Sequence, residues 1–222
     1  MDKIADLSLN ITETFRSIQG ETSYSGLLTS FIRLSQCNLR CTWCDTTYSF
    51  SRGKAIAIQD LVKTVEGYGC PYVCITGGEP LLQANVHPLM DLLCDRGYKL
   101  SIETGGSLST KEIDHRVKVI LDIKCPGSTM ESKNHWENLS YLKEGDEVKF
   151  VLLDFADYEY AKSICQKYSL FQQPIELLFS PVHGKLSPRE LVEEMLNDNL
   201  PASARLNLQL HKYVWDPMTK GV

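Results

Sequence analysis

Three closely spaced cysteines constrain this chain more than any other feature of its sequence. Cys37, Cys41 and Cys44 follow one another with the spacing C-x3-C-x2-C. Thiolates are the soft ligands that zinc, copper(I) and iron–sulfur clusters prefer. A closed structural zinc site normally takes four protein ligands, and no fourth Cys or His is near in sequence. The spacing therefore favours a 4Fe–4S cluster with one iron left free by the protein, and zinc or inert thiols are the alternatives.

The composition is typical of a globular protein and argues against two classes of partner. Of the 222 residues, 43% are hydrophobic and 23% are charged, and the net charge is −5. The negative charge gives no basic field for nucleic acid, and no apolar run reaches the roughly 20 residues of a membrane span. The segment Met1–Asp6 lacks the apolar core of a secretory signal, so the eight cysteines indicate a reducing, cytoplasmic location. We expect one domain, residues 1–222, without repeats or linkers.

Short apolar runs alternate with helical patterns along the chain. Strands are predicted at residues 9–15, 29–34, 72–76, 99–103, 117–123, 147–153, 175–179 and 205–210. Helices are predicted at residues 59–68, 81–94, 136–143 and 158–168, and a last one begins at Ser187-Pro188. Strands that alternate with helices indicate a parallel α/β sheet. About six such units fall short of the eight of a closed barrel, so we predict a partial, open β/α barrel.

Polar and glycine-rich motifs follow successive predicted strands. These are the cysteine loop, Gly77-Gly78-Glu79-Pro80, Glu103-Thr104, Asp122-Ile123-Lys124 and Ser180-Pro181. Ligands of barrel-like α/β folds bind at the carboxyl ends of the strands, so one cavity is expected to collect these motifs. Arg33 lies within the strand that leads to the cysteine loop. It either faces solvent or, if buried, needs an anionic partner such as a ligand carboxylate.

The cysteine spacing together with the Gly-Gly-Glu-Pro segment resembles the radical S-adenosylmethionine (SAM) superfamily. In that superfamily the free iron of a 4Fe–4S cluster binds SAM, which is cleaved to a 5′-deoxyadenosyl radical. The resemblance implies that Cys37, Cys41 and Cys44 hold the cluster. It also implies SAM contacts from Gly77, Gly78, Glu79, Glu103, Asp122 and Lys124.

Further segments resemble one family within the superfamily, the 7-carboxy-7-deazaguanine synthases. They are residues 15–21, 31–34, 44–46, 75–82, 102–104 and 209–212. The resemblance implies a carbon–nitrogen lyase of queuosine biosynthesis. Its reaction would convert 6-carboxy-5,6,7,8-tetrahydropterin to 7-carboxy-7-deazaguanine with loss of ammonia, starting with hydrogen abstraction at C6.

The same resemblance implies how the pterin is held and which partners take part. Substrate-binding residues would be Gln19, Glu21, Arg33, Thr76 and His211. The Thr46 hydroxyl would bind Mg²⁺, a hard cation that prefers oxygen ligands and would assist the ring contraction. No side chain is assigned as a general acid or base, because a radical starts the reaction. A homodimer and an electron donor such as flavodoxin or ferredoxin are expected.

Two positions depart from the family pattern. Thr22 stands where a glycine commonly follows the Gln-Gly-Glu segment. The Asp122-Ile123-Lys124 segment replaces the Ser-Pro-Lys expected in several relatives, which leaves the contacts to the SAM ribose open.

The other cysteines and histidines have simpler interpretations. Free cysteines commonly behave as small buried hydrophobes, which is expected of Cys70, Cys74, Cys94, Cys125 and Cys165. His87, His115, His135 and His183 have no metal-like spacing. The alternative functions are a glycyl-radical-enzyme activase and a non-enzymatic iron–sulfur or zinc protein.

Overall fold

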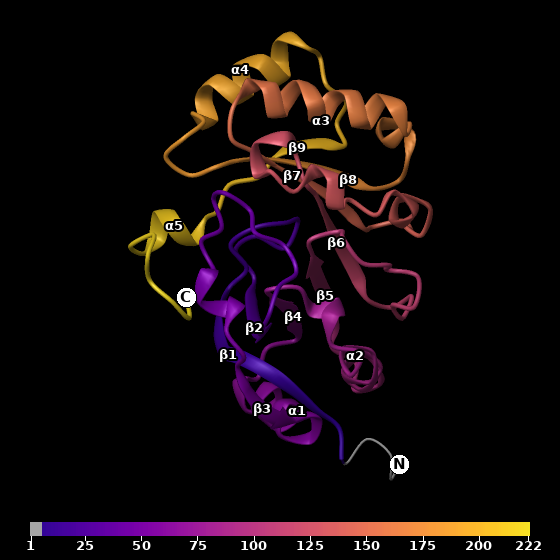
Figure 1. Cartoon of the computed structure of the whole chain (residues 1–222), viewed down its shortest axis with the longest axis vertical. Helices are drawn as coiled ribbons and strands as arrows, with labels where there is room; N and C mark the ends of the chain where they lie inside the picture. Colours follow the sequence, from indigo (N-terminus) through magenta and orange to yellow (C-terminus); the bar gives the residue numbers. More distant parts are fainter. Residues whose placement is uncertain (1–5) are drawn as a thin grey trace.

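The computed structural model describes residues 6–222, which form one nine-stranded sheet with the longer helices on its outer face (Figure 1). The prediction that no secretory signal is present concerns mainly the five residues that lie outside this range. The strands are β1 (Ser8–Ile18), β2 (Leu28–Leu34), β3 (Lys54–Ala57), β4 (Tyr72–Gly77), β5 (Lys99–Thr104), β6 (Lys118–Ile123), β7 (Glu147–Leu152), β8 (Glu176–Pro181) and β9 (Ala204–Leu206). The α-helices are α1 (Ile58–Tyr68), α2 (Val86–Asp95), α3 (Phe155–Lys167), α4 (Pro188–Asn197) and α5 (His211–Val214).

The sheet is curved, mostly parallel and open. Its strand order is β3-β1-β2-β4-β5-β6-β7-β8-β9, so the edge strands β3 and β9 do not pair with each other. All pairs from β2 to β9 are parallel, whereas β1 runs antiparallel to both β2 and β3. This arrangement confirms the predicted partial, open β/α barrel. Within the described part of the chain, each helix is too short or too polar to cross a membrane.

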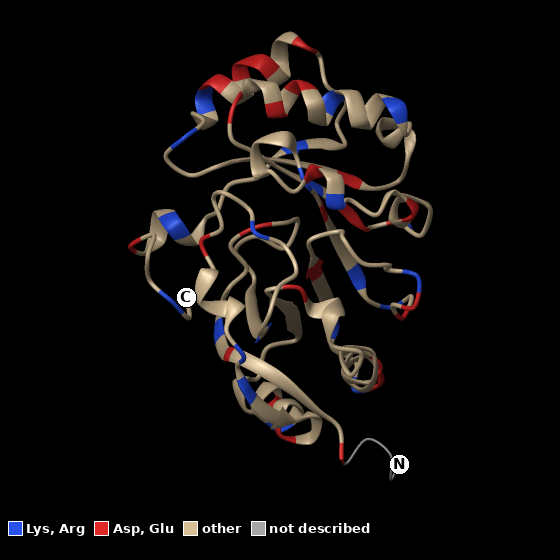
Figure 2. Ribbon diagram, in the orientation of Figure 1, with Lys and Arg blue, Asp and Glu red and all other residues tan. Residues whose placement is uncertain are grey.

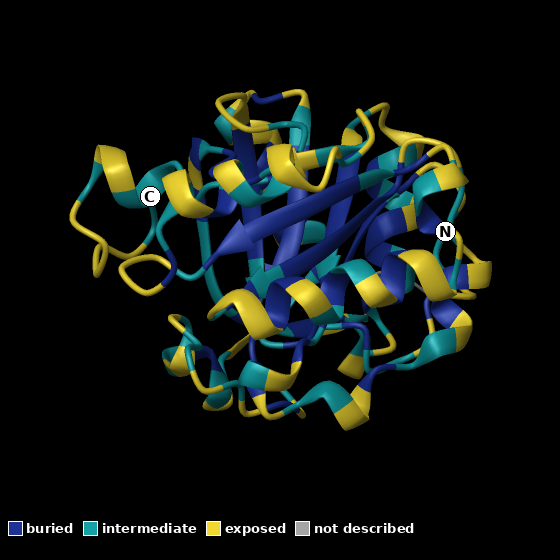
Figure 3. Cartoon of the chain, turned by 90° about the horizontal axis from the view of Figure 1, so that it is seen from above, coloured by how far each residue is buried: buried dark blue, intermediate teal, exposed yellow. Residues whose placement is uncertain are grey.

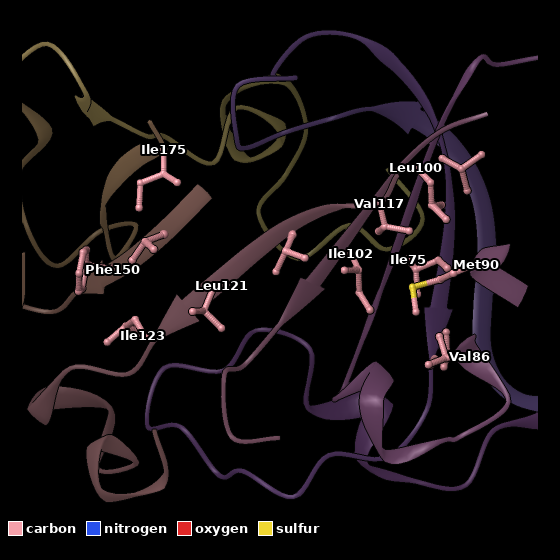
Figure 4. Close-up of a cluster of buried hydrophobic side chains, with 14 of the residues drawn as sticks. Ile75, Val86, Met90, Leu100, Ile102, Val117, Leu121, Ile123, Phe150 and Ile175 are labelled. Atoms are coloured by element: carbon pink, nitrogen blue, oxygen red, sulfur yellow. The ribbon is translucent and has the colours of Figure 1, made fainter. Parts of the chain in front are cut away.

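Alternation along the strands separates an apolar core from a polar concave face. On β6, Val119, Leu121 and Ile123 belong to the main hydrophobic cluster, which also contains helix residues such as Val86 and Met90 (Figure 4). The helices turn their exposed residues outward from the buried strands (Figure 3). The intervening positions of the strands face the other way, because successive side chains of a strand point to opposite faces. Charged residues accordingly occur on the central strands as well as on the outer helices (Figure 2).

Several predicted boundaries were wrong, for local reasons. The helix predicted from Leu81 begins only at Val86, because residues 80–82 form a 3₁₀ turn that the Glu79 side chain caps. Residues 136–143 contain a 3₁₀ helix, Trp136–Ser140, in place of a longer helix. Helix α3 begins three residues earlier than predicted, because the Asp154 side chain accepts a hydrogen bond from Asp157 N.

The two ends of the sheet also differ from the prediction. The strand predicted at residues 205–210 ends at Leu206, and the following side chains bind other loops. The strand β3 and the antiparallel direction of β1 were not predicted. A four-residue strand such as β3 leaves little periodic signal in a sequence.

Candidate active site

A cavity of about 650 Å³ lies at the carboxyl ends of the parallel strands. It is large enough for a drug-sized ligand, since such sites typically measure about 300–1,000 Å³. The predicted site residues that line it are Gln19, Glu21, Arg33, Cys37, Cys41, Cys44, Thr46, Thr76, Gly77, Gly78, Glu103, Asp122, Lys124 and His211. One predicted site residue, Glu79, does not line it. The sequence motifs therefore converge in space as expected.

The three cysteines of the triad lie in the loop after β2 and share this cavity. Each is a free, partly exposed thiol, and burial raises the pKa of each one. Leu39 N donates to Cys37 Sγ at 3.4 Å, which orients that thiol. A metal displaces the proton when it binds a thiolate, so iron binding here is coupled to proton release. Three soft donors that face one cavity fit a 4Fe–4S cluster with a free iron.

The Gly77-Gly78 pair lets the next strand approach the cysteine loop closely. Gly78 N donates to Leu34 O at 3.1 Å. A Cβ on Gly78 would lie 2.0 Å from Gln36 O, and one on Gly77 would lie 2.3 Å from Leu34 O. Such contacts are not possible for any other residue, so the glycines bring the β4 end against the chain that leads to Cys37.

Glu79 holds the loops together from behind the cavity. Its carboxylate is fully buried and accepts hydrogen bonds from Leu81 N, Thr104 Oγ1 and Gly105 N. The distance from Gly105 N to Glu79 Oε2 is 2.7 Å. The structure therefore places Glu79 where it supports the glycine loops, and a contact from its carboxylate to SAM stays a prediction.

Glu103 lies among the residues predicted for the substrate. It accepts from Gln19 Nε2 at 3.3 Å and from Thr76 Oγ1 at 3.1 Å. The thiol of Cys74 lies 3.6 Å from the same carboxylate. Glu103 was predicted to contact SAM, but its neighbours in the structure are members of the predicted substrate set.

Arg33 already has a protein partner. Its Nε lies 2.8 Å from Glu13 Oε1, and Tyr48 OH donates to the same oxygen at 2.8 Å. The two strands set this pair, since Glu13 and Arg33 are directly opposite in the β1–β2 register. A buried guanidinium without a partner would be costly, but Glu13 removes that cost. Glu13 is thus the anionic partner that a buried Arg33 was expected to need, so no ligand carboxylate is required to neutralise it, although Arg33 still lines the cavity.

Lys149 on β7 is a cavity residue that the sequence analysis missed. Its Nζ lies 2.8 Å from Glu21 Oε2 and 3.8 Å from Asp122 Oδ2, and Asp122 Oδ2 lies 3.0 Å from Lys124 Nζ. Burial raises the pKa of Glu21, but Lys149 and a hydrogen bond from Gln209 outweigh it and the net pKa is lowered. The sequence did contain an indication of this site, because the charged residues Glu147 and Lys149 occupy alternate positions of the strand and therefore share one face.

Thr46 and His211 lie at the mouth of the cavity. Thr46 Oγ1 donates to Asp45 Oδ1 at 2.9 Å, so the hydroxyl has a protein acceptor. His211 begins α5 and packs on Gly20, where an added Cβ would lie 2.1 Å from His211 Nδ1. Burial lowers the pKa of His211, although Glu21 opposes the shift. Among residues 6–222, no three His, Cys, Asp or Glu side chains gather so as to hold a single metal ion.

The other cysteines lie outside the cavity, whereas one further histidine lines it. Cys70, Cys74, Cys125 and Cys165 are buried and Cys94 is partly exposed, which agrees with their interpretation as small packing residues. His183 is exposed and lines the cavity opening, where its ring contacts Tyr213.

A model of the radical SAM superfamily matches residues 32–170, a segment that starts within β2, includes the cysteine loop and ends just past α3. Because this match covers more than half of the chain, the protein belongs to the radical SAM superfamily. It is accordingly an enzyme whose cofactors are a 4Fe–4S cluster and SAM.

Relatives that align with nearly the full length of the chain define its family more narrowly. The chain is 43% identical to the 7-carboxy-7-deazaguanine synthase of Chlorobaculum tepidum over 96% of this chain and 97% of the relative. It is 40% identical to that of Koribacter versatilis, over 96% of this chain and 100% of the relative. Within the superfamily, the chain therefore groups with the 7-carboxy-7-deazaguanine synthases.

Solved structures share the fold at lower identity. The crystal structure of QueE from Escherichia coli superposes with a TM-score of 0.77 at 24% identity, covering 92% of this chain and 95% of that one. SuiB of Streptococcus suis, bound to its precursor peptide, gives 0.59 at 16% identity, covering 78% of this chain and 46% of that one. These likenesses support the open barrel.

Proposed function

We propose that this enzyme converts 6-carboxy-5,6,7,8-tetrahydropterin to 7-carboxy-7-deazaguanine and ammonia. One observation carries the proposal: the cysteine triad shares a single cavity with charged and amide side chains suited to a polar, carboxylated ring. The names of the relatives at 43% and 40% identity point to the same product.

The cofactors would occupy the side of the cavity formed by the cysteine loop. Cys37, Cys41 and Cys44 would hold the cluster, and the backbone beside Gly77 and Gly78 would contact SAM, with Asp122 and Lys124 close by. When bound, cluster and SAM together supply a 5′-deoxyadenosyl radical able to abstract hydrogen from C6 of the pterin. The protein's contribution is to bind, to orient and to exclude water. Thr46, at the mouth, would provide an oxygen ligand for Mg²⁺ beside the substrate.

The pterin would lie against the β1–β2 loop and the ends of β2, β4 and β5. The guanidinium nitrogens of Arg33 other than Nε would bind the substrate carboxylate, and a charge-assisted pair of this kind fixes orientation. Glu21 would accept from the donor edge of the ring. Gln19, Thr76 and His211 would complete the hydrogen bonds, with Glu103 holding Gln19 and Thr76 in place.

We further propose the partners that the family resemblance implies, and a reducing location suited to free thiols. A low-potential electron donor such as flavodoxin or ferredoxin would reduce the cluster. The active form would be a homodimer of single-domain subunits in the cytoplasm, where thiols stay reduced.

Anaerobic reconstitution with iron and sulfide, followed by incubation with SAM, reductant and the carboxylated pterin, tests the proposal. The expected products are 7-carboxy-7-deazaguanine and ammonia. SAM cleavage without conversion of the pterin would contradict the substrate and leave an activase or another radical SAM reaction. A reconstituted protein that binds zinc but no 4Fe–4S cluster would contradict the whole proposal.

A further inference from the structure

The loop between β1 and β2 carries Gln19 and Glu21 and is held by the concave face of the sheet. Ser23 N donates to Glu147 Oε1 at 3.0 Å, and Lys118 Nζ donates to Ser23 Oγ at 2.7 Å. Thr22 N donates to Asn207 Oδ1 at 2.8 Å. Side chains on β6, β7 and the segment after β9 therefore hold the two residues that follow Glu21.

Lys149 makes the contact that reaches Glu21 itself. It lies two residues after Glu147 on β7, on the same face of the strand. Its side chain is 9% exposed, and its Nζ lies between Glu21 Oε2 at 2.8 Å and Asp122 Oδ2 at 3.8 Å. The other oxygen of Glu21 accepts from Gln209 Nε2 at 2.9 Å. Both carboxylate oxygens of Glu21 are thus oriented by the protein before a ligand arrives.

We propose that Lys149 is a positioning residue that keeps Glu21 as a charged, fixed hydrogen-bond acceptor for the substrate, a role that rests on the proposed function. A carboxylate buried without a cation favours its neutral form. A protonated Glu21 would offer a hydroxyl donor to the donor edge of the ring, which reverses the interaction. Lys149 prevents this reversal, because protonating Glu21 would leave the ammonium with a weaker partner.

The charged surroundings of Glu21 make Lys149 the dominant partner. His211 on α5 faces Glu21, and burial lowers the pKa of this histidine, so it adds little positive charge near neutral pH. Asp122 and Glu103 lie near Lys149 and carry negative charge. Lys124 is ion-paired with Asp122. The pKa of Lys149 is raised above its usual value despite burial, so the residue stays charged throughout the working range.

The pH dependence of turnover separates this role from a merely structural one. Lys149→Met removes the charge, Lys149→Arg keeps it, and Lys149→Gln is a second neutral variant in case the first does not fold. In the neutral variants only the ionised fraction of Glu21 would bind the carboxylated pterin, so KM should rise by about tenfold per pH unit below the new pKa of Glu21. At alkaline pH, KM should approach the wild-type value. Lys149→Arg should restore the wild-type profile. The double variant Lys149→Met/Glu21→Gln should lose the added pH dependence, because the carboxyl group proposed to titrate is gone.

Lys118→Met is the matched control. It also deletes a partly buried lysine on the concave face, ion-paired with Glu147 at 2.7 Å, but Lys118 does not line the cavity. It should lower Tm and, because Lys118 also holds Ser23 in the β1–β2 loop, change KM by the same factor at every pH, without moving the acid limb of the KM profile. A uniform rise of KM at every pH in Lys149→Met and Lys149→Gln would overturn the proposal, as would an equal shift of the acid limb in Lys118→Met.

A second readout does not need turnover. Infrared difference spectra of the holoenzyme, titrated with acid, report the protonated carboxyl of Glu21, with Glu21→Gln identifying the band. The band should appear at lower pH in wild type than in Lys149→Met. Equal titration in the two proteins would overturn the role of Lys149. If wild type makes no deazapurine, the proposed function fails, and the titration still decides whether Lys149 sets the charge of Glu21.

Discussion

Lys212 forms an ion pair with Asp45, the residue that follows the last cysteine of the triad. Gln209, three residues earlier, has its Nε2 2.9 Å from Glu21 Oε1 and 3.4 Å from Asp45 Oδ2. The segment after β9 thereby joins the cysteine loop to the β1–β2 loop and covers one side of the cavity mouth.

The Asp45–Lys212 pair predicts a specific loss of stability in acid. Burial raises the pKa of Asp45, but Lys212 outweighs it and the pKa is about 2 in the folded protein, against 3.8 for an ordinary aspartate. Because the folded pKa is the lower one, the stabilisation is present above the unfolded pKa and is lost as the pH falls toward the folded one. Between about pH 4 and about pH 2, Tm of wild type should fall more than Tm of Asp45→Asn. Thermal unfolding followed by circular dichroism checks this, with the exposed surface variant Glu193→Gln as a control that should follow wild type.

Replacing any cysteine of the triad should abolish the cluster. Cys37→Ala, Cys41→Ala or Cys44→Ala leaves two thiols, too few for three irons. Iron content and visible absorption after anaerobic reconstitution are the measurements, with SAM cleavage as the functional readout. Cys94→Ala, which changes a partly exposed thiol outside the cavity, should retain both. A full 4Fe–4S spectrum in a triad variant would contradict the assignment.

Magnesium stimulation should depend on the Thr46 hydroxyl. Thr46→Val keeps the side-chain volume and removes the oxygen, so cluster assembly should persist while stimulation by Mg²⁺ falls. Thr47→Val, at the neighbouring position of the same cavity wall, is the control. Unchanged Mg²⁺ dependence of turnover in Thr46→Val would exclude this residue from the metal site.

Arg33 should recognise the substrate carboxylate even though Glu13 occupies its Nε. Losing a charge-assisted hydrogen bond typically costs about 1.5–3 kcal/mol, so Arg33→Ala should weaken binding of the carboxylated pterin by that amount. Arg33→Lys should restore binding only in part, because an ammonium lacks the planar fork. Calorimetric titration with the carboxylated pterin and its decarboxylated analogue is the measurement. Equal affinity of wild type for the two ligands would remove this role from Arg33.

Thr22 should tolerate glycine better than an isosteric side chain. Its φ of +67° lies in the left-handed region, where residues other than glycine are strained. Such strain costs on the order of 1–3 kcal/mol. Thr22→Val keeps the strain and loses the Oγ1 that accepts from Tyr24 N at 3.1 Å. We expect Thr22→Gly to exceed Thr22→Val in free energy of unfolding by about 1 kcal/mol, measured by urea denaturation. The reverse order would show that residue 22 carries no backbone strain.

The sequence predicted the fold class and the convergence of motifs, because both follow from local signals. Strand–helix alternation requires parallel strands, and parallel strands bring their carboxyl ends together. It did not predict the Glu13–Arg33 pair, which depends on the register of an antiparallel hairpin. Nor did it predict a role for Lys149, because Glu147 and Lys149, the two charged residues of that strand, find their partners in a loop 124 and 128 residues away in the sequence. The role of Glu79 could not be predicted from the sequence for the same reason, since its partners Thr104 and Gly105 lie at the end of another strand, β5.

The contacts that complete the cavity join parts of the chain separated by very long stretches of sequence. Gln209 and Glu21 are 188 residues apart, and Lys212 and Asp45 are 167 apart. Contacts of high sequence separation carry the largest loop-closure entropy and form late in folding. Synthesis proceeds from the amino terminus, so a nascent chain presents its cysteine loop long before residues 209–212 exist to cover it. Residues 209–212 therefore cannot cover the cysteine loop until almost the whole of this sequence has been synthesised.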